Sequence, residues 1–184
     1  MPRRASRSFA APWRFRPWLT PRRWPLAALG VSALMLAAAH AFQAAGYAPC
    51  HLCLRQREVY WSVIALSAAA LAANRFRPNA RQAQLFTILI ALGFLYGAGL
   101  AAFHAGVEWK FWPGPESCAA VGDFSGDLEA ALNRRIVAVP CDEAAWRDPV
   151  TTLSMAGWNA IISLALAAFS FFAAALPVVR PARD

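Results

Sequence analysis

Four long apolar segments, separated by polar stretches, constrain this chain more than any other feature. They run over about residues 25–47, 53–73, 83–103 and 152–179. Each is long enough to cross about 30 Å of hydrocarbon as an α-helix. Charged residues make up only 15% of the 184 residues, whereas a soluble domain is about one-quarter charged. The sequence therefore predicts an all-α integral membrane protein, an antiparallel four-helix transmembrane bundle with two periplasmic loops.

The distribution of arginines orients these segments. Seven arginines lie in residues 1–23 and three more in residues 74–82, whereas nine of the ten acidic residues lie from Glu58 to Asp148. Basic residues in short connections are typical of the cytoplasmic side of a membrane protein. We therefore expect a multi-pass membrane protein with both termini cytoplasmic. The net charge of +8 would also suit nucleic-acid binding, but this sorting argues against it and for contact with membrane lipid.

This orientation divides the chain into three parts. Residues 1–24 form a basic cytoplasmic N-terminal arm, residues 25–179 the transmembrane domain, and residues 180–184 a cytoplasmic tail. Within the domain, residues 104–151 make the only sizeable polar loop. The first apolar segment also has features of a cleavable secretory signal. Its apolar run continues to Ala48, longer than a signal core needs, so we expect it to remain as a membrane span.

All four cysteines fall on the predicted outer side. Cys50 and Cys53 are separated by two residues, and Cys118 and Cys141 lie in the large loop. An oxidising compartment permits disulfides and an even count favours two pairs, although four cysteines allow three pairings. A C-x-x-C ring is tight and typical of redox chemistry, so we predict a redox cysteine pair at the membrane surface. Two alternatives stay open: disulfides that only staple the outer loop, and a metal site of four thiolates, which the wide spacing of the second pair disfavours.

Arg57 follows Cys53 by one helical turn. If a helix begins near Cys53, this spacing places the guanidinium on the same face as the sulfur. A nearby cation and a helix N-terminus favour the thiolate, which is the reactive form of cysteine. His51, inside the ring, is a second candidate for this role, and simple exposure to water is its alternative. Arg57 could instead extend to lipid headgroups, but a charge near hydrocarbon is costly, which favours a functional role.

Five short motifs lie along roughly residues 30–175 of the chain. They are Pro49-Cys50-His51-Leu52-Cys53 with Gln56-Arg57, His104-Ala105-Gly106-Val107-Glu108 with Trp112, Gly114-Pro115-Glu116-Ser117-Cys118, Pro140-Cys141-Asp142, and Ser154-Met155-Ala156-Gly157-Trp158-Asn159. In these motifs the chain resembles the bacterial DsbB family, membrane thiol:quinone oxidoreductases, and the resemblance implies that it lies in the bacterial inner membrane. The N-terminal arm is longer than the family requires.

The resemblance implies a function and a set of site residues. The protein would oxidise a periplasmic thioredoxin-fold thiol oxidase (DsbA-like) and pass the electrons to a membrane quinone, either ubiquinone or menaquinone. It would use two redox-active disulfides, Cys50–Cys53 and Cys118–Cys141, as catalytic groups. The partner would attack Cys118, exchange would proceed through Cys50, and Cys53 would face the quinone. Arg57 would stabilise the Cys53 thiolate and a quinone oxygen.

Two further polar residues follow the third apolar segment. The resemblance makes His104 a candidate for hydrogen bonding to the quinone or for proton transfer, and a plain interfacial histidine is the alternative. We expect Glu108 to be a solvated loop acid rather than a site residue. We assign no resident metal. Three rival functions remain: a non-enzymatic membrane scaffold with structural disulfides, a metal-handling membrane protein that uses four thiolates, and a paralogue dedicated to one specialised oxidase.

Overall fold

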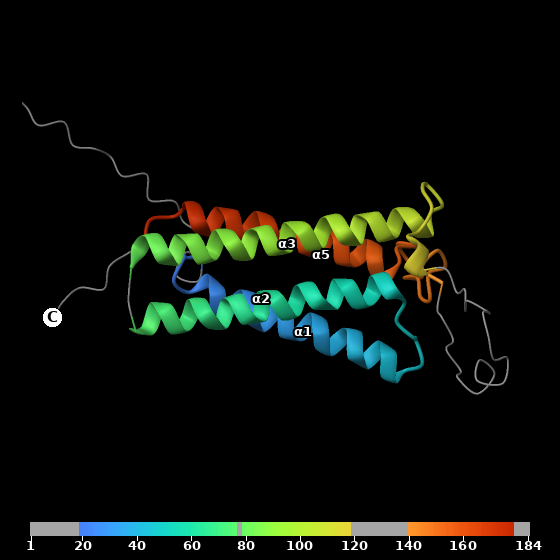
Figure 1. Cartoon of the computed structure of the whole chain (residues 1–184), viewed down its shortest axis with the longest axis horizontal. Coiled ribbons are helices and arrows are strands. Elements are labelled where there is room, and N and C mark those ends of the chain that lie inside the picture. The colour runs from blue at the N-terminus through green and yellow to red at the C-terminus, as the bar shows by residue number, and fades with distance from the viewer. Residues whose placement is uncertain (1–18, 77–78, 119–139, 179–184) are drawn as a thin grey trace, which may run out of the picture.

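Four long helices form an antiparallel bundle in the computed structural model, which describes residues 19–76, 79–118 and 140–178 (Figure 1). The helices are α1 (Trp24–Ala44), α2 (His51–Phe76), α3 (Ala80–Glu108) and α5 (Met155–Ala175), with the short 3-10 helix η1 (Glu116–Cys118) between α3 and α5. Each of the four long helices has the length and apolar composition to cross a membrane. The predicted fold class, an all-α membrane protein built as a four-helix bundle, is confirmed.

Parts of the predicted segments lie outside the described residues, namely residues 1–18 of the arm, 119–139 of the large loop, and 179–184 at the C-terminal end. Within the described part, α3 continues beyond the expected end of its span at residue 103 and ends at Glu108. This extension places residues that were expected in the outer loop on a rigid helix.

Side-chain caps fix where two of the helices begin. The Asn79 side chain accepts a hydrogen bond from the backbone N–H of Arg81 and starts α3. The Ser154 hydroxyl accepts one from the backbone N–H of Gly157 and starts α5. Such caps satisfy amide groups that the first turn of a helix leaves without partners. The Ser154 cap also fixes the end of α5 that lies nearest the cysteines.

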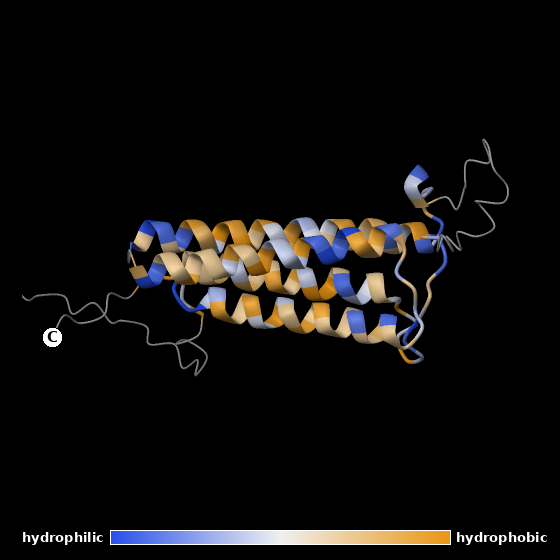
Figure 2. Cartoon of the chain, turned by 60° about the horizontal axis from the view of Figure 1, so that its bottom comes forward, coloured by the Kyte–Doolittle hydropathy of each residue, from blue (hydrophilic) through white to orange (hydrophobic). Residues whose placement is uncertain are grey.

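The bundle places large apolar side chains outward and small ones inward. Leu34 is 68% exposed and Trp61 is 58% exposed, whereas Ser32, Ser67 and Ala28 are fully buried. Figure 2 shows hydrophobic residues along the length of the helices, with hydrophilic residues more frequent toward the two ends of the bundle. Membrane helices pack in this way, because lipid solvates the large apolar groups and small residues let the backbones approach. The protein is therefore a multi-pass membrane protein.

Close packing at the inner faces joins the helices in a definite order. α3 packs most extensively against α5, α2 packs against α3, and α1 packs against α2. At Gly97 of α3, an added Cβ would lie 3.1 Å from Val59 Cγ1 on α2, so a larger residue would push these helices apart. The central core contains Val63, Ile90 and Phe94.

The segment after α3 folds back over the end of that helix. Trp112 donates a hydrogen bond from Nε1 to the Phe103 carbonyl oxygen at 3.0 Å. Its ring covers Gly106, where an added Cβ would lie 2.0 Å from Trp112 Cζ2. Only glycine therefore fits at residue 106 beneath this ring. The fold-back brings Cys118 to the end of the bundle at which α2 begins.

Candidate active site

Cys50 and Cys53 lie at the N-terminus of α2. Their Sγ atoms are 2.8 Å apart and both residues are free thiols. The backbone N–H of Cys53 donates to Cys50 Sγ at 3.3 Å, as at a helix N-cap. The pKa of the buried Cys50 thiol is lowered, mainly because the Cys53 side chain hydrogen-bonds to its sulfur, and further because of the nearby His104 imidazole. Cys50 is therefore the sulfur of this pair that the site holds as a thiolate.

Cys118 and Cys141 form a disulfide with an S–S distance of 2.01 Å. The expected pairing within the large loop is therefore confirmed. Both residues are buried in one cluster with Cys50, and Leu52 and Val107 complete that cluster. The other predicted disulfide, Cys50–Cys53, is present as a dithiol. A metal site of four thiolates is not formed, because two of the four sulfurs are bonded to each other.

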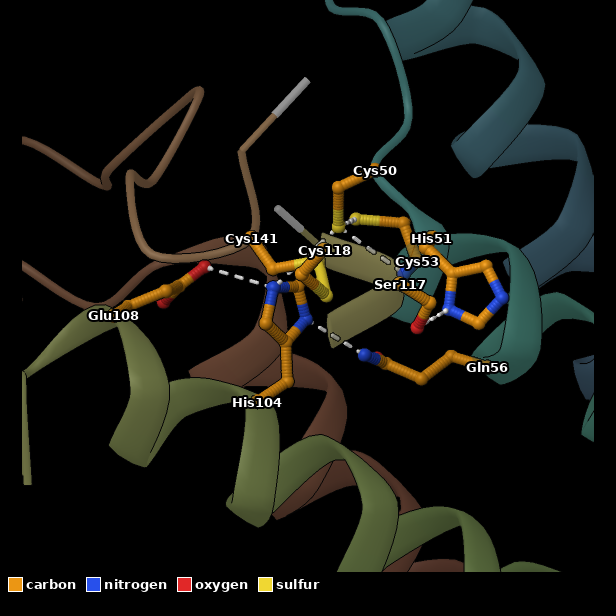
Figure 3. Close-up of a disulfide and its surroundings, with 9 residues drawn as sticks. All are labelled: Cys50, His51, Cys53, Gln56, His104, Glu108, Ser117, Cys118 and Cys141. Atoms are coloured by element: carbon orange, nitrogen blue, oxygen red, sulfur yellow. Dashed lines mark hydrogen bonds and ion pairs between the residues drawn. A yellow bond between two sulfur atoms is a disulfide. The ribbon is translucent and has the colours of Figure 1, made fainter. Parts of the chain in front are cut away.

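His104 is buried, and its ring projects from α3 toward the cysteines (Figure 3). Its Nε2 atom is 3.5 Å from Cys50 Sγ, and its Nδ1 atom is 2.8 Å from Gln56 Nε2. Because α3 extends to Glu108, His104 projects from a helix rather than from a loop. The imidazole beside Cys50 is thus His104. His51, the other candidate, is exposed, and its Nδ1 lies 3.1 Å from Ser117 Oγ.

Glu108 is only 8% exposed, so its expected place as a solvated loop acid is wrong. It lies one turn beyond His104, with Oε1 3.8 Å from His104 Nε2. Its Oε2 atom has no hydrogen-bond partner among the described residues. A buried carboxylate oxygen without a partner is costly, and Glu108 lies on the wall of a cavity beside the cysteine pair.

A cavity of about 350 Å³ opens beside the cysteine pair. Its wall includes both sulfurs of the pair and the polar side chains of Gln56, Arg57 and His104. The remaining wall is largely apolar and includes Met35, Leu36, Phe42, Tyr60, Trp146, Met155 and Ile162. The cavity therefore offers an apolar enclosure with a few hydrogen-bonding groups next to reactive sulfur.

Arg57 lines this cavity together with Cys53, but its hydrogen bonds go to α1. Nη1 donates to Gln43 Oε1 at 2.6 Å, and Nη2 donates to the Ala39 carbonyl oxygen at 3.1 Å. The guanidinium thus joins α1 to α2 at the cavity wall. Two of its five N–H groups serve these contacts, which leaves others for a bound molecule.

A series of hydrogen bonds leads from His104 to side chains of α2 and α5. The sequence did not indicate this series. Asn159 Nδ2 on α5 donates to Gln56 Oε1 at 2.5 Å, and Tyr60 OH on α2 donates to Asn159 Oδ1, also at 2.5 Å. Ser163 Oγ lies 3.2 Å from the same Asn159 oxygen. Two signals were available. Gln56 and Asn159 both stand in the motifs named from the sequence, and both are polar residues within apolar segments, where polar groups are costly unless paired.

Cys50, Cys53 and His104 also offer three metal-ligating atoms within 4.8 Å of one another. Two thiolates and an imidazole are ligands that suit Zn²⁺. A metal held by both sulfurs would prevent their oxidation to a disulfide, so metal binding and redox exchange exclude each other at this pair.

The fold and this arrangement define a class: a helical membrane protein with a dithiol and a disulfide packed together at one end of its bundle. The chain matches the family described as "Disulfide bond formation protein DsbB" over residues 21–173, and it belongs to that family. It is therefore a membrane oxidoreductase of disulfide bond formation. No curated protein and no solved structure matches the chain.

Proposed function

We propose that this protein oxidises the dithiol of a periplasmic thioredoxin-fold thiol oxidase and passes the electrons to a membrane quinone. Cys118 and Cys141 would accept the electrons from the partner, and Cys50 and Cys53 would pass them on. The observation that carries this proposal is the position of Cys50. It belongs to the buried cluster that contains the Cys118–Cys141 disulfide, and it also lies on the wall of the apolar cavity.

The relay proceeds by attack of a thiolate on a disulfide sulfur. A partner thiolate attacks Cys118 Sγ, which breaks the Cys118–Cys141 bond and releases Cys141 as a thiolate. Cys141 then attacks Cys50 of the oxidised inner pair and releases Cys53 as a thiolate. The second partner thiolate attacks the partner's own sulfur in the mixed disulfide, which frees Cys118 and the oxidised partner. Cys118 attacks Cys141, restores the loop disulfide and leaves two electrons on Cys50 and Cys53.

The arrangement of the four cysteines supports this order. The Cys118–Cys141 disulfide lies in the same buried cluster as Cys50, the sulfur through which exchange would reach the inner pair.

The cavity fits a quinone headgroup. Its volume of about 350 Å³ lies within the range of roughly 300–1,000 Å³ that small-molecule sites occupy. Its wall is mostly apolar, and Arg57 carries N–H groups that can donate to carbonyl oxygens. A quinone, when bound, would supply an acceptor of two electrons and two protons. Cys53, Arg57 and His104 are the residues that would contact it.

A coupled assay tests this function. The purified protein would be mixed with a reduced thioredoxin-fold oxidase and a soluble quinone, and the quinone absorbance would be followed. We expect continuous quinone reduction that depends on both the partner and the protein. Cys53→Ser should abolish it. Turnover that persisted in folded Cys53→Ser protein would contradict the proposal.

The orientation proposed from the arginines needs its own test. The cysteines would face the periplasm, with residues 1–24 and 180–184 in the cytoplasm. A reporter fused at residue 79 should stay cytoplasmic, whereas one fused within residues 104–151 should be exported. The opposite pattern would reverse the orientation and place the cysteines in a reducing compartment.

A further inference from the structure

We propose that Gln56, Asn159 and Tyr60 are positioning residues that hold His104 as the tautomer with its proton on Nε2, so that the imidazole donates a hydrogen bond to Cys50 Sγ. We call the series Tyr60, Asn159, Gln56 and His104 the polar relay. The inference deepens the proposed function, since it rests on Cys50 as a reacting sulfur, but its tests require neither quinone nor partner.

The polar relay runs in one direction across three helices. Tyr60 OH donates to Asn159 Oδ1, and Asn159 Nδ2 donates to Gln56 Oε1. With its oxygen thus occupied, the Gln56 amide presents its NH₂ group to His104 Nδ1 at 2.8 Å. An amide NH₂ group can only donate, so Nδ1 must accept, and the proton of a neutral imidazole is then on Nε2.

Acceptor groups gather on the other side of the ring. Cys50 Sγ is 3.5 Å from Nε2, and Glu108 Oε1 is 3.8 Å from it. An Nε2–H therefore meets acceptors, whereas a lone pair at Nε2 would face a thiolate and a carboxylate. The relay on one side and the acceptors on the other favour the same tautomer.

Burial makes the hydrogen bond between Gln56 and His104 costly to lose. Gln56 is 7% exposed and His104 is 3% exposed, so water cannot replace a missing partner. Buried polar groups of this kind are stable only when each finds a partner. A ring held on Nδ1 by Gln56 keeps its N–H directed at Cys50. Without that contact, the ring is free to rotate or to change its tautomer.

The consequence for Cys50 is that His104 acts as a hydrogen-bond donor to its thiolate. The other groups that bear on this thiolate are Cys53, which donates from its side chain and backbone, and Glu108, whose charge opposes it. Arg147 acts on Glu108 from the loop before α5. The polar relay thus maintains one of these interactions, the hydrogen bond from His104 to the Cys50 thiolate. Removing the relay should make Cys50 less reactive at acidic pH, because less of it is then in the thiolate form.

The tautomer itself can be measured by nitrogen-15 NMR of protein with labelled histidine, reduced and free of quinone. The chain has three histidines, so the spectrum of His104→Gln protein assigns the resonances. We expect a protonated Nε2 and an unprotonated Nδ1 in His104. A proton on Nδ1 with a bare Nε2 would overturn the inference, because Gln56 would then have to accept from the ring.

Alkylation of Cys50 measures the effect on reactivity. Reduced protein would receive a short pulse of iodoacetamide between pH 4 and 9, with the modified cysteine located by mass spectrometry. Loss of a hydrogen bond to a charged sulfur should lower the rate at acidic pH about tenfold in Gln56→Met. Asn159→Leu should have a smaller effect, and Tyr60→Phe the smallest, since Ser163 still donates to Asn159.

Ser170→Ala is the matched control. Ser170 also lies on α5 and is fully buried, and its Oγ accepts a hydrogen bond from Trp24 Nε1 on α1 at 2.8 Å. Its loss should affect packing and leave the alkylation profile of Cys50 unchanged. An unchanged profile in folded Gln56→Met protein, or an equal shift in Ser170→Ala, would show that the relay serves only helix packing.

These outcomes separate the inference from the proposed function. If the protein reduces quinone normally but His104 has the opposite tautomer, the inference about the polar relay is wrong and the proposed function stands. If the tautomer and the alkylation profile are as expected but quinone is not reduced, the proposed function is wrong and the inference stands.

Discussion

The two ends of the bundle satisfy their buried polar groups in different ways. Far from the cysteines, buried hydroxyls either donate to backbone carbonyls or have no partner among the described residues. Thr87 donates to the Ala83 and Pro21 carbonyls, and Ser170 donates to the Leu166 carbonyl while accepting from Trp24 Nε1. Ser32 Oγ and Ser67 Oγ have no partner within the described part of the chain. Near the cysteines, side chains from three helices bond to one another in series. A bond to a carbonyl of the same helix needs no partner helix. A series across helices requires each member to be in place, so polar side chains that bond in this way mark the working end of a membrane bundle.

Cys118→Ala should break the working end most completely. Without this sulfur the partner has no loop disulfide to attack, and turnover with the partner should fall to background. Cys50 and Cys53 lie on the cavity wall and should still react with a soluble quinone. Measuring both reactions on one preparation checks the order in which the cysteine pairs exchange electrons. An unchanged rate with the partner would contradict the proposed attack on Cys118.

Phe94→Ala tests the packing of the bundle core. Phe94 is 1% exposed and lies edge-on to Tyr60, with ring centroids 6.4 Å apart. Phenylalanine-to-alanine changes in soluble cores cost about 3–5 kcal/mol, and we expect about 2–3 here, since lipid removes much of the transfer contribution. Unfolding in detergent measures the cost. Leu34→Ala, on the exposed face, is the matched control and should change stability little.

Arg57→Met tests the charge at the cavity wall. A charge-assisted hydrogen bond contributes about 1.5–3 kcal/mol, so its loss should cost roughly ten- to a hundredfold in the kcat or KM for quinone. Arg57→Lys should recover part of the loss, although it lacks the planar fork of arginine. Exchange between the partner and Cys118 should be unaffected.

Arg55→Met is the control for this change. Arg55 lies in the same part of α2 and forms an exposed ion pair with Glu58. It does not line the cavity. Kinetics over a quinone series should show wild-type constants for Arg55→Met. Wild-type constants for folded Arg57→Met would reduce Arg57 to a link between α1 and α2.

The smallest effect should come from the exposed ion pair between Lys110 and Asp142. Lys110 lowers the pKa of the Asp142 carboxyl, so any stabilisation is present above the unfolded pKa and is lost as the pH falls through the folded pKa. Because both groups are exposed, salt should screen the pair. Asp142→Asn should therefore differ from wild type only slightly at neutral pH and low salt, and not at all in acid. A large stability loss at high salt would contradict this.

The fold was predictable because the length of an apolar run reports directly on a membrane span. The four cysteines were predictable as a group, since the distribution of arginines predicts that all four lie on the same side of the membrane. The place of Glu108 was not, because the sequence does not show where α3 ends. His104 was assigned by resemblance, but its contact with Cys50 depends on that same extension.

The polar relay was beyond the sequence for a different reason. Gln56 and Asn159 are 103 positions apart, and they meet only because α2 and α5 present these faces to each other. The rotation of each helix about its own axis depends on the packing of the whole bundle, and no single residue in the sequence indicates it. Arg57 illustrates the same limit: its spacing from Cys53 places both at the cavity, yet its partners Gln43 and Ala39 lie on a third element.

A single-turnover measurement tests the central claim most directly, namely that the Cys50–Cys53 dithiol reduces an acceptor in the adjoining cavity. Protein with Cys118→Ala and Cys141→Ala would be reduced, freed of reductant and mixed anaerobically with one equivalent of soluble quinone. We predict that about one quinone is reduced per protein and that both remaining thiols disappear, because a dithiol yields two electrons on forming a disulfide. Thiols that persist in folded protein while the quinone stays oxidised would contradict the account.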